Sequence, residues 1–391
     1  MLPMKTLTII KIILFLNFFS LVLDTGAVES PDIVVENVYG DSKYYHLVTA
    51  VTKKHDGLGI LVAGSQTLSG AKGEKPSFFL WEFDGLGKLI STINLDFLPI
   101  DGKFHSDVPY IKSILQLNDG FIYLIYVSQK GRPYFIKFKD KAERPYIKEI
   151  EVNSSDIDLR KMIIHQENKL LILGRSVGDA FLLQVKNDGN ILWKKKYDRG
   201  KIETFVDGYV DLEGNFILLG NSSEYQVSNF YPSSSEIFFM QIASTGTVIN
   251  EKSYSGRYGD IVHDNSGIAV VFDKSDDESQ KVTFMKVNDD FEKLQEKSIF
   301  SSKLGFTRSF YILISGNGFW IVGEAGRDML VAKYDKDGNA IRSYVGRGTS
   351  NSRRIKGAVS DQLGVTLITR IYSEDEQRKI NYKVGFLRFK E

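Results

Sequence analysis

A five-residue segment recurs seven times along the chain, mainly apolar but always with a polar residue in its fourth position. The copies, which align without a gap, are FLWEF at 79–83, YFIKF at 134–138, FLLQV at 181–185, FFMQI at 238–242, TFMKV at 283–287, LVAKY at 330–334 and GFLRF at 385–389. One polar position in an apolar run fits the two-residue period of a β-strand. The copies stand about 50 residues apart, which is within the range of a β-propeller blade.

A second apolar segment precedes each copy and forms another strand of the same unit. These segments are ILVAGS from residue 60, YLIYVS from 123, LLILGRS from 170, FILLGNS from 216, IAVVFD from 268, FWIVGE from 319 and VTLITR from 365. Four of the seven reach a glycine near their end, at Gly64, Gly174, Gly220 and Gly323. Glycine in a strand admits a β-bulge or the close approach of another backbone, so its recurrence indicates packing rather than ligand binding.

Turn sequences separate the strands, as in NDGNILWKKKYD at 187–198 and its weaker copy DKDGNAIRSYVG at 335–346. Asp-Gly and Gly-Asn supply the positive φ of a tight hairpin, so we expect four antiparallel strands in each unit. The stretch at 335–339 also looks like the start of a calcium loop, but the distal glutamate of such a loop is missing. We interpret it as a turn and expect no metal.

The last unit lacks a fourth strand, and a segment at the other end of the chain has the missing pattern. DIVVENVYGD at 32–41 alternates like a fourth strand and leads into the first unit. Closing a ring in this way removes exposed sheet edges. We therefore predict an all-β, seven-bladed β-propeller over residues 28–391, a single domain in which residues 33–39 pair beside residues 384–389.

The first residues have the pattern of a secretory signal peptide. Lys5 and Lys11 precede an apolar run at 12–23, and the small residues of Thr25-Gly26-Ala27 follow it. The run has about 12 residues, whereas a spanning helix needs roughly 20, so a retained anchor is the weaker alternative. We expect a signal peptide at 1–27 and an extracytoplasmic protein, periplasmic or secreted, without a stable transmembrane segment after processing.

Charge and cysteine content exclude several classes of function. The chain has 50 Lys and Arg residues against 49 Asp and Glu, and no cysteine. Nucleic-acid binding normally requires a basic excess, so we expect no nucleic-acid partner. The absence of cysteine excludes disulfides, thiolate metal sites and a cysteine nucleophile. We expect a monomer that packing alone stabilises.

The strand repeats and the turn that follows them resemble the exported bacterial β-propellers whose blades end in a D-x-G-x-x-W-like tail. Trp193 preserves the tryptophan of that tail. This broad group is related to the quinoprotein-like and WD-type propellers, and the resemblance implies a fold over roughly residues 30–391 without specifying an activity. The calcium and quinone pocket of the quinone-dependent members is not recognisable here, so we expect no cofactor.

The candidate binding residues lie in the segments that lead into the first strand of each unit, which we call the inlet loops. In a propeller these loops converge on the central channel. They include Arg160, Arg308 and Arg353, whose guanidinium groups could bind an acidic ligand by bidentate hydrogen bonds, together with the aromatic residues Tyr110 and Tyr258. We predict that these five residues contribute to a ligand site, and that the three arginines face one funnel.

No catalytic motif identifies an enzyme. The five histidines are scattered singly, and we expect them on loops and strand surfaces. Neither G-x-S-x-G nor a phosphate-binding glycine loop occurs. Our first hypothesis is a non-catalytic exported propeller that binds a protein or glycan through its inlet-loop face. The alternative is a propeller enzyme, a lyase or hydrolase acting on a carbohydrate or lactone, with acid and base residues from separate blades.

Overall fold

The computed structural model describes residues 33–40, 43–68, 75–100, 110–139, 144–152, 156–166, 168–224, 235–264, 267–274, 280–302, 307–325, 328–346, 353–374 and 380–391. The predicted signal peptide, the start of the domain at residue 28 and His105 lie outside these ranges. Every regular element in the described ranges is a β-strand. They hold no helix of the length and hydropathy that crossing a membrane takes.

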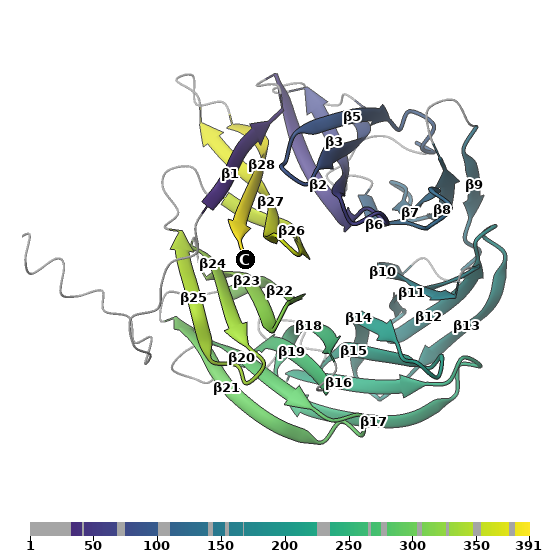
Figure 1. The fold of residues 1–391 in the computed structure, drawn as a ribbon. Helices are drawn as coiled ribbons and strands as arrows, with labels where there is room; N and C mark the ends of the chain where they lie inside the picture. Colours follow the sequence, from purple (N-terminus) through teal and green to yellow (C-terminus); the bar gives the residue numbers. More distant parts are fainter. Residues whose placement is uncertain are drawn as a thin grey trace, which may run out of the picture.

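The strands form seven antiparallel sheets of four strands each, arranged as blades around a centre (Figure 1). Blade 1 has β2 (Tyr44–Lys53), β3 (Gly59–Leu68), β4 (Ser77–Asp84) and β5 (Leu89–Asn94), blade 2 has β6 (Tyr110–Gln116), β7 (Ile122–Val127), β8 (Pro133–Phe138) and β9 (Tyr146–Glu149), and blade 3 has β10 (Ile157–Gln166), β11 (Lys169–Ser176), β12 (Asp179–Lys186) and β13 (Ile191–Tyr197). Blade 4 has β14 (Ile202–Val210), β15 (Phe216–Ser223), β16 (Ser235–Ile242) and β17 (Val248–Ser255), and blade 5 has β18 (Arg257–Asp264), β19 (Gly267–Asp273), β20 (Gln280–Val287) and β21 (Lys293–Ser302). Blade 6 has β22 (Thr307–Ser315), β23 (Gly318–Ala325), β24 (Asp328–Asp335) and β25 (Ala340–Gly346), and blade 7 has β26 (Arg353–Asp361), β27 (Gly364–Glu374), β28 (Ile380–Lys390) and β1 (Ile33–Tyr39).

The N-terminal strand closes the ring, as the sequence predicted. β1 pairs antiparallel with β28, with Ile33 opposite Phe389 and Tyr39 opposite Val384. The ring of Tyr39 also packs on Phe83 of blade 1, with centroids 5.0 Å apart. The first strand therefore joins the last blade to the first and covers a sheet edge that would otherwise be exposed.

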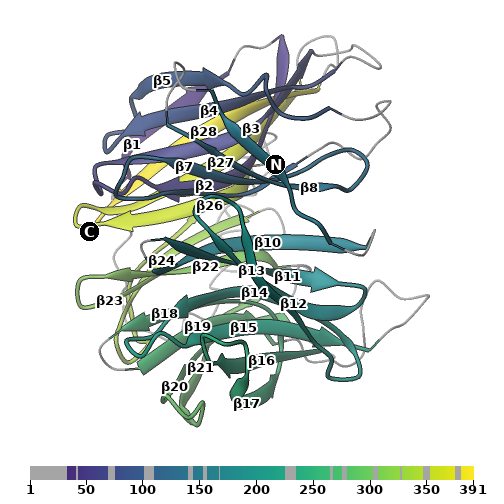
Figure 2. The same cartoon turned by 90° about the vertical axis from the view of Figure 1, so that its right-hand side faces the viewer.

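The core of the molecule is divided among the seven junctions between blades. Each junction holds one cluster of buried apolar side chains, contributed by the facing sheets of two neighbouring blades. Between blades 1 and 2, for example, Leu80 packs with Leu124 and Ile136. The first strands of the blades contact one another around the whole ring (Figure 2 shows it from the side). Fully burying one such side chain is worth about 1.5–3 kcal/mol, so the junctions hold the ring together.

The Asp-Gly stretches are turns, as predicted. Asp335 Oδ1 accepts the backbone N–H groups of Asp337 at 2.9 Å and Asn339 at 2.8 Å, and Gly338 has a φ of 66°. Asp188 caps its own turn in the same way, accepting the N–H of Asn190 at 2.9 Å. Both aspartates therefore fix the hairpin between the third and fourth strands of a blade.

The polar residue of each repeat lies within or near a junction and is engaged there. Arg388 is 2% exposed and donates to the carbonyl oxygen of Gly85 at 2.6 Å and to Asp361 at 2.5 Å. Lys333 donates to the carboxylate of Glu391 at 2.6 Å. Buried polar groups need such partners, which explains why a polar residue persists in an apolar strand.

Candidate ligand-binding channel

Every innermost strand carries a β-bulge at the same level of the ring. In β2, β6, β10, β14 and β26 a single residue has no partner on the second strand; these residues are Thr49, Lys112, Arg160, Val206 and Lys356. In β18 the two residues between Arg257 and Asp260 face one residue of β19, and β22 has the same two-to-one arrangement before Tyr311. A β-bulge bends the strand and redirects a side chain. The ring of bulges therefore sets which side chains meet at the centre.

The recurrent glycines lie opposite these bulges. A Cβ added to Gly174 would lie 2.1 Å from the carbonyl oxygen of Asp158, and one added to Gly323 would lie 2.1 Å from the ring of Phe310. Only glycine admits this closeness. The prediction that these glycines serve packing is confirmed: Gly64, Gly174 and Gly323 lie against the bulged innermost strand, and Gly220 lies against the ring of Phe238 on the third strand.

The inlet half of the centre is a cavity of about 620 Å³, which we call the inlet chamber. Its lining residues come from β2, β6, β10, β22, β26 and β27. Four of them are cationic: Lys112, Arg160, Lys356 and Arg370. No acidic side chain is among the described residues that line it, and the rings of Tyr110 and Tyr311 supply aromatic surface. The lining therefore presents cationic groups and aromatic side chains to the cavity.

The cations of the inlet chamber are only partly neutralised by neighbours. Asp158 accepts a hydrogen bond from Lys112 Nζ at 3.1 Å and forms an ion pair with Arg160, whose Nη2 lies 2.5 Å from Oδ2, so one carboxylate serves two cations. Neither Lys356 nor Arg370 forms an ion pair with any residue that the structure describes. Burial lowers the pKa of Lys356, and nearby Arg370 lowers it further, against the opposing effect of Glu324. The lowered pKa therefore reflects mainly the burial of Lys356 and, to a smaller extent, the positive charge beside it.

The deeper half of the centre, which we call the deep chamber, has a volume of about 400 Å³ and contains a pair of carboxylates. Asp207 on β14 and Asp260 on β18 hydrogen bond to each other, and Lys161 Nζ donates to Asp207. Asp260 Oδ2 also accepts the backbone N–H of Ile312 at 2.9 Å. The two carboxylates therefore join blades 4, 5 and 6 at the axis.

The pKa values of the two carboxyl groups are shifted in opposite directions. Burial, together with the negative charge of Asp207, raises the pKa of Asp260 well above its ordinary value. Burial is also the largest single effect on Asp207, but the charge and hydrogen bond of Lys161, the hydrogen bond with Asp260 and the N–H of Gly208 together outweigh it and hold the pKa of Asp207 below its ordinary value. The pair therefore keeps one proton, mainly on Asp260, over a range in which isolated aspartates are ionised.

The structure brings two of the five predicted residues to the inlet chamber. Arg160 and Tyr110 line it, and Lys112 Nζ lies 5.4 Å from the centroid of the Tyr110 ring. Tyr258 does not belong to the lining: its side chain is 57% exposed, it has a φ of 53°, and its N–H donates to Asn221 Oδ1 at 2.9 Å.

Arg308 and Arg353 lie on β22 and β26, and their side chains are outside the described residues. In the backbone register of their sheets, Arg308 stands opposite Glu324 and Arg353 opposite Ile371. Both residues therefore precede the bulges of their strands. Arg160 is itself a bulge residue, and its counterpart in blade 7 is Lys356. The convergence of the three arginines on one ligand remains a prediction.

Sequence reasoning missed Lys112, Lys356, Arg370 and the Asp207–Asp260 pair. The available signal was the repeated glycine, which marks the level of the bulge on the neighbouring strand. Counting one residue on from the partner of Gly174 leads to Arg160, but blades 2 and 7 have Tyr126 and Thr369 in place of the glycine, so this signal does not reach Lys112 or Lys356. No signal links Asp207 to Asp260, because they come from separate blades.

The expectation that the histidines lie on loops and strand surfaces was wrong for two of them. His46 is 3% and His165 8% exposed. Nδ1 of His165 shares a hydrogen bond with Gln184 at 2.7 Å, and its ring packs edge-on against Phe216 at 4.7 Å. Both occupy blade junctions, where a polar ring with an apolar body can replace an aromatic residue.

The fold and the channel define a seven-bladed β-propeller with a cationic central site. No protein-family model matches the chain, and no curated protein is similar to it in sequence. Among solved structures, the chain is similar to a protein from Bacteroides fragilis provisionally named a 6-phosphogluconolactonase, at 10% identity and a TM-score of 0.51, with 90% of this chain and 99% of that chain covered. It is also similar to a puromycin-hydrolysing peptidase from Mycobacterium tuberculosis, at 9% identity and a TM-score of 0.54, with 87% of this chain but only half of the peptidase covered. A protein of unknown function from Bacteroides caccae matches at 13% identity and a TM-score of 0.45, covering 74% of this chain and 94% of the other.

Similarity at this level of identity shows the fold alone. The predicted propeller class is confirmed, and the site has to be interpreted from its own residues.

Proposed function

We propose that this chain is an exported, non-catalytic propeller that binds a small acidic sugar in its inlet chamber. The observation that carries the proposal is the lining: four cations, of which Lys356 and Arg370 form no ion pair with a described residue, and no described acidic side chain. A carboxylate placed among them would receive charge-assisted hydrogen bonds, which are roughly twice as strong as neutral ones.

The size of the chamber favours a small ligand. Its volume of about 620 Å³ lies within the range of small-molecule sites, roughly 300–1,000 Å³. A folded protein cannot enter such a space, although an acidic peptide end could. The Tyr110 and Tyr311 rings offer flat apolar surface of the kind that packs against a sugar ring, while the cations select the acid group.

Isothermal titration calorimetry with the purified mature protein tests this proposal. The probes are trigalacturonate and, as the neutral control of the same size, maltotriose. We expect saturable binding of trigalacturonate that weakens with added salt, and at least 10-fold weaker binding of maltotriose. Binding of an acidic peptide in place of the uronate would change the ligand class. Equal affinity for the two sugars, or none for either, would contradict the proposal.

A second candidate, an enzyme acting on a carbohydrate or lactone, is favoured by one observation. Asp207 and Asp260 provide a base and an acid from separate blades, next to the 400 Å³ deep chamber. Two carboxylates whose pKa values are pushed apart can divide the roles of proton acceptor and donor. Turnover of a uronic-acid glycoside or lactone that falls by about 100-fold or more in Asp260→Asn would support this candidate.

A further inference from the structure

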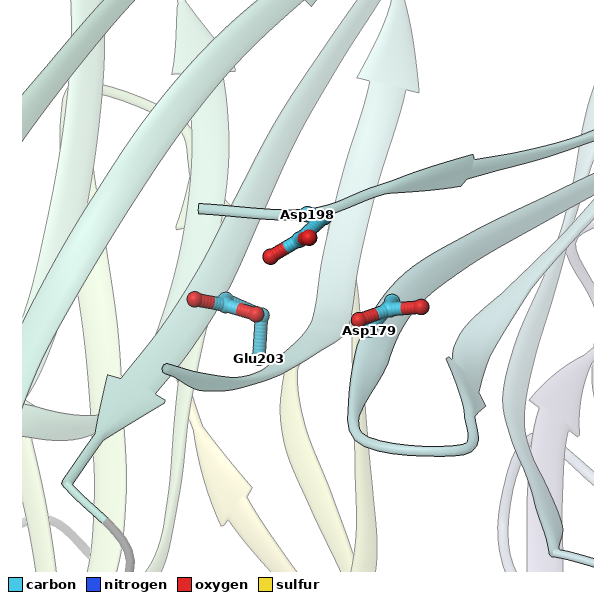
Figure 3. Close-up of side chains that lie close together, drawn as sticks. All are labelled: Asp179, Asp198 and Glu203. Atoms are coloured by element: carbon cyan, nitrogen blue, oxygen red, sulfur yellow. The ribbon is translucent and has the colours of Figure 1, made fainter. Parts of the chain in front are cut away.

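Three carboxylates from neighbouring strand ends meet on the inlet side of blades 3 and 4, away from the channel lining. Asp179 begins β12, Asp198 directly follows β13, and Glu203 is the second residue of β14. One oxygen of each lies within 4.8 Å of the others. Figure 3 shows the three carboxylates arranged around a common space.

One of these carboxylates is buried with an oxygen that nothing satisfies. Glu203 is 0% exposed, and its Oε1 accepts the backbone N–H of Lys201 at 2.8 Å. Its Oε2 is fully enclosed and has no hydrogen-bond partner in the described part of the chain. Burying a carboxylate oxygen without a partner is costly, so this position is suited to a cation.

The cationic side chains around the cluster are largely directed elsewhere. Arg199 donates to Glu251 at 2.7 Å and to Ser253 at 2.6 Å, on the outer strand of blade 4, although its charge also acts on Glu203 and partly offsets the burial that raises the pKa of that carboxyl. Lys201 pairs with Glu236 at 3.4 Å. Of the three carboxylates, only Asp179 forms an ion pair within the part of the chain that the structure describes, with Lys196 at 3.4 Å. The cluster therefore keeps an excess of negative charge.

We propose that Asp179, Asp198 and Glu203 bind a calcium ion that joins blade 3 to blade 4. The ligands are all carboxylate oxygens, which suit a hard cation rather than zinc or copper. Calcium takes oxygen ligands at about 2.3–2.6 Å, so two oxygens on opposite sides of the ion stand roughly 5 Å apart, close to the separation seen here; magnesium, at about 2.0–2.1 Å, would require the carboxylates to close further. Asp198 is exposed, so water can complete the coordination.

The backbone already holds the two blades in register at this point. Val177 and Gly178 form the turn before Asp179 with φ values of 52° and 86°, and the Gly178 carbonyl accepts the N–H of Glu203 at 2.7 Å. The existing hydrogen bonds leave free lone pairs on each carboxylate, because a carboxylate offers about four acceptor positions. The ligands are thus positioned before the ion arrives.

The test is calcium titration of the full mature chain after treatment with a chelator. We expect one calcium ion per chain, with a Kd of about 10⁻⁴ to 10⁻³ M as in extracellular modules, and weaker magnesium binding. Thermal unfolding should shift to higher temperature as calcium is added, because the ion binds only the folded state.

Two variants and a control locate the site. Asp198→Asn changes an exposed residue and should weaken calcium binding at least 10-fold without loss of folding by circular dichroism, and Glu203→Gln should do the same. Glu213→Gln removes an exposed carboxylate at the β14–β15 turn and should leave the calcium affinity unchanged. The absence of saturable calcium binding up to about 10 mM, or binding that both folded variants retain, would overturn the proposal.

Discussion

The propeller uses β-bulges at two radii, and the two sets carry different chemistry. On the innermost strands every blade has a bulge, and single bulge residues there include Thr49, Lys112, Arg160, Val206 and Lys356. On the outermost strands six blades have a bulge whose extra residue is aliphatic and partly exposed: Val34, Ile90, Leu192, Ile249, Leu294 and Ile341. β21 has a second bulge, at the buried Ile299.

The difference separates features that repeat from blade to blade from features that vary, and the proposed ligand site is built on the varying ones. The extra residues of the outer bulges are all aliphatic, as expected if each bulge only bends its fourth strand. The inner bulges share their backbone geometry but differ in side chain from blade to blade. Three of the inner bulge residues are cations, and they line both the inlet chamber and the deep chamber. In a repeat protein, variation at a structurally constant position indicates function, whereas repetition indicates packing.

The largest effect on stability should come from adding a side chain to a glycine that lies against an inner bulge. Gly174→Ala should lower the free energy of unfolding by about 3 kcal/mol, because the new Cβ would lie 2.1 Å from the Asp158 carbonyl oxygen. It should also displace Arg160 and weaken uronate binding. Chemical denaturation and calorimetry measure the two effects.

Gly85→Ala is the matched control for this change. A Cβ there would lie 3.2 Å from its nearest neighbour, in a turn far from the bulges, so the cost should be well below that of Gly174→Ala. Equal losses of stability in both variants would mean that the inner bulges are not under steric constraint.

The inner cations should dominate ligand affinity. The double variant Lys112→Ala/Lys356→Ala should weaken trigalacturonate binding about 100-fold or more, since each hydrogen bond to a charged group contributes roughly 1.5–3 kcal/mol. The matched control is Lys148→Ala/Lys252→Ala, which removes two exposed lysines from outer strands and should leave the affinity within about twofold. Equal losses of trigalacturonate affinity in the two double variants would mean that Lys112 and Lys356 act only through the overall charge of the protein and not by contacting the ligand.

The carboxylate pair predicts a specific pH dependence of stability. Asp260 has a pKa raised above its unfolded value, so the folded state holds the proton longer and stability is lost as the pH rises from about 4 through the folded pKa. Asp260→Asn removes this loss while keeping a donor for Asp207. It should therefore stabilise the protein at pH 7 and change its stability little at pH 4.

Melting temperatures of wild type and Asp260→Asn between pH 4 and pH 8 check this expectation. If the melting temperatures of the two proteins change in parallel with pH, the Asp207–Asp260 pair does not retain a proton.

The sequence predicted the architecture far better than the site, for a physical reason. The blade number, the strand order and the closure by β1 depend on repeated apolar and turn patterns, each of which acts within a few residues. Arg160 and Tyr110 could be predicted because they precede an apolar strand in a repeat. Lys356 was missed because a bulge adds one residue to its strand, so counting from the loop assigns the wrong residue to the channel.

The smallest effect should follow from changing an outer bulge. Ile249→Ser replaces an aliphatic side chain that is 54% exposed, so it should change the free energy of unfolding by no more than about 0.5 kcal/mol and leave uronate affinity unaltered. A clear loss of uronate binding in Ile249→Ser, measured by the same calorimetry, would show that the outermost strands belong to the ligand site.

The most direct test of the central claim is a crystal structure of the protein grown with trigalacturonate. We predict that one sugar carboxylate lies in the inlet chamber within about 3 Å of the ammonium of Lys112 or Lys356, with its ring beside Tyr110 or Tyr311. A uronate bound on the outer rim or on another face, with the chamber holding only water, would contradict the claim that the inner bulges form a ligand site.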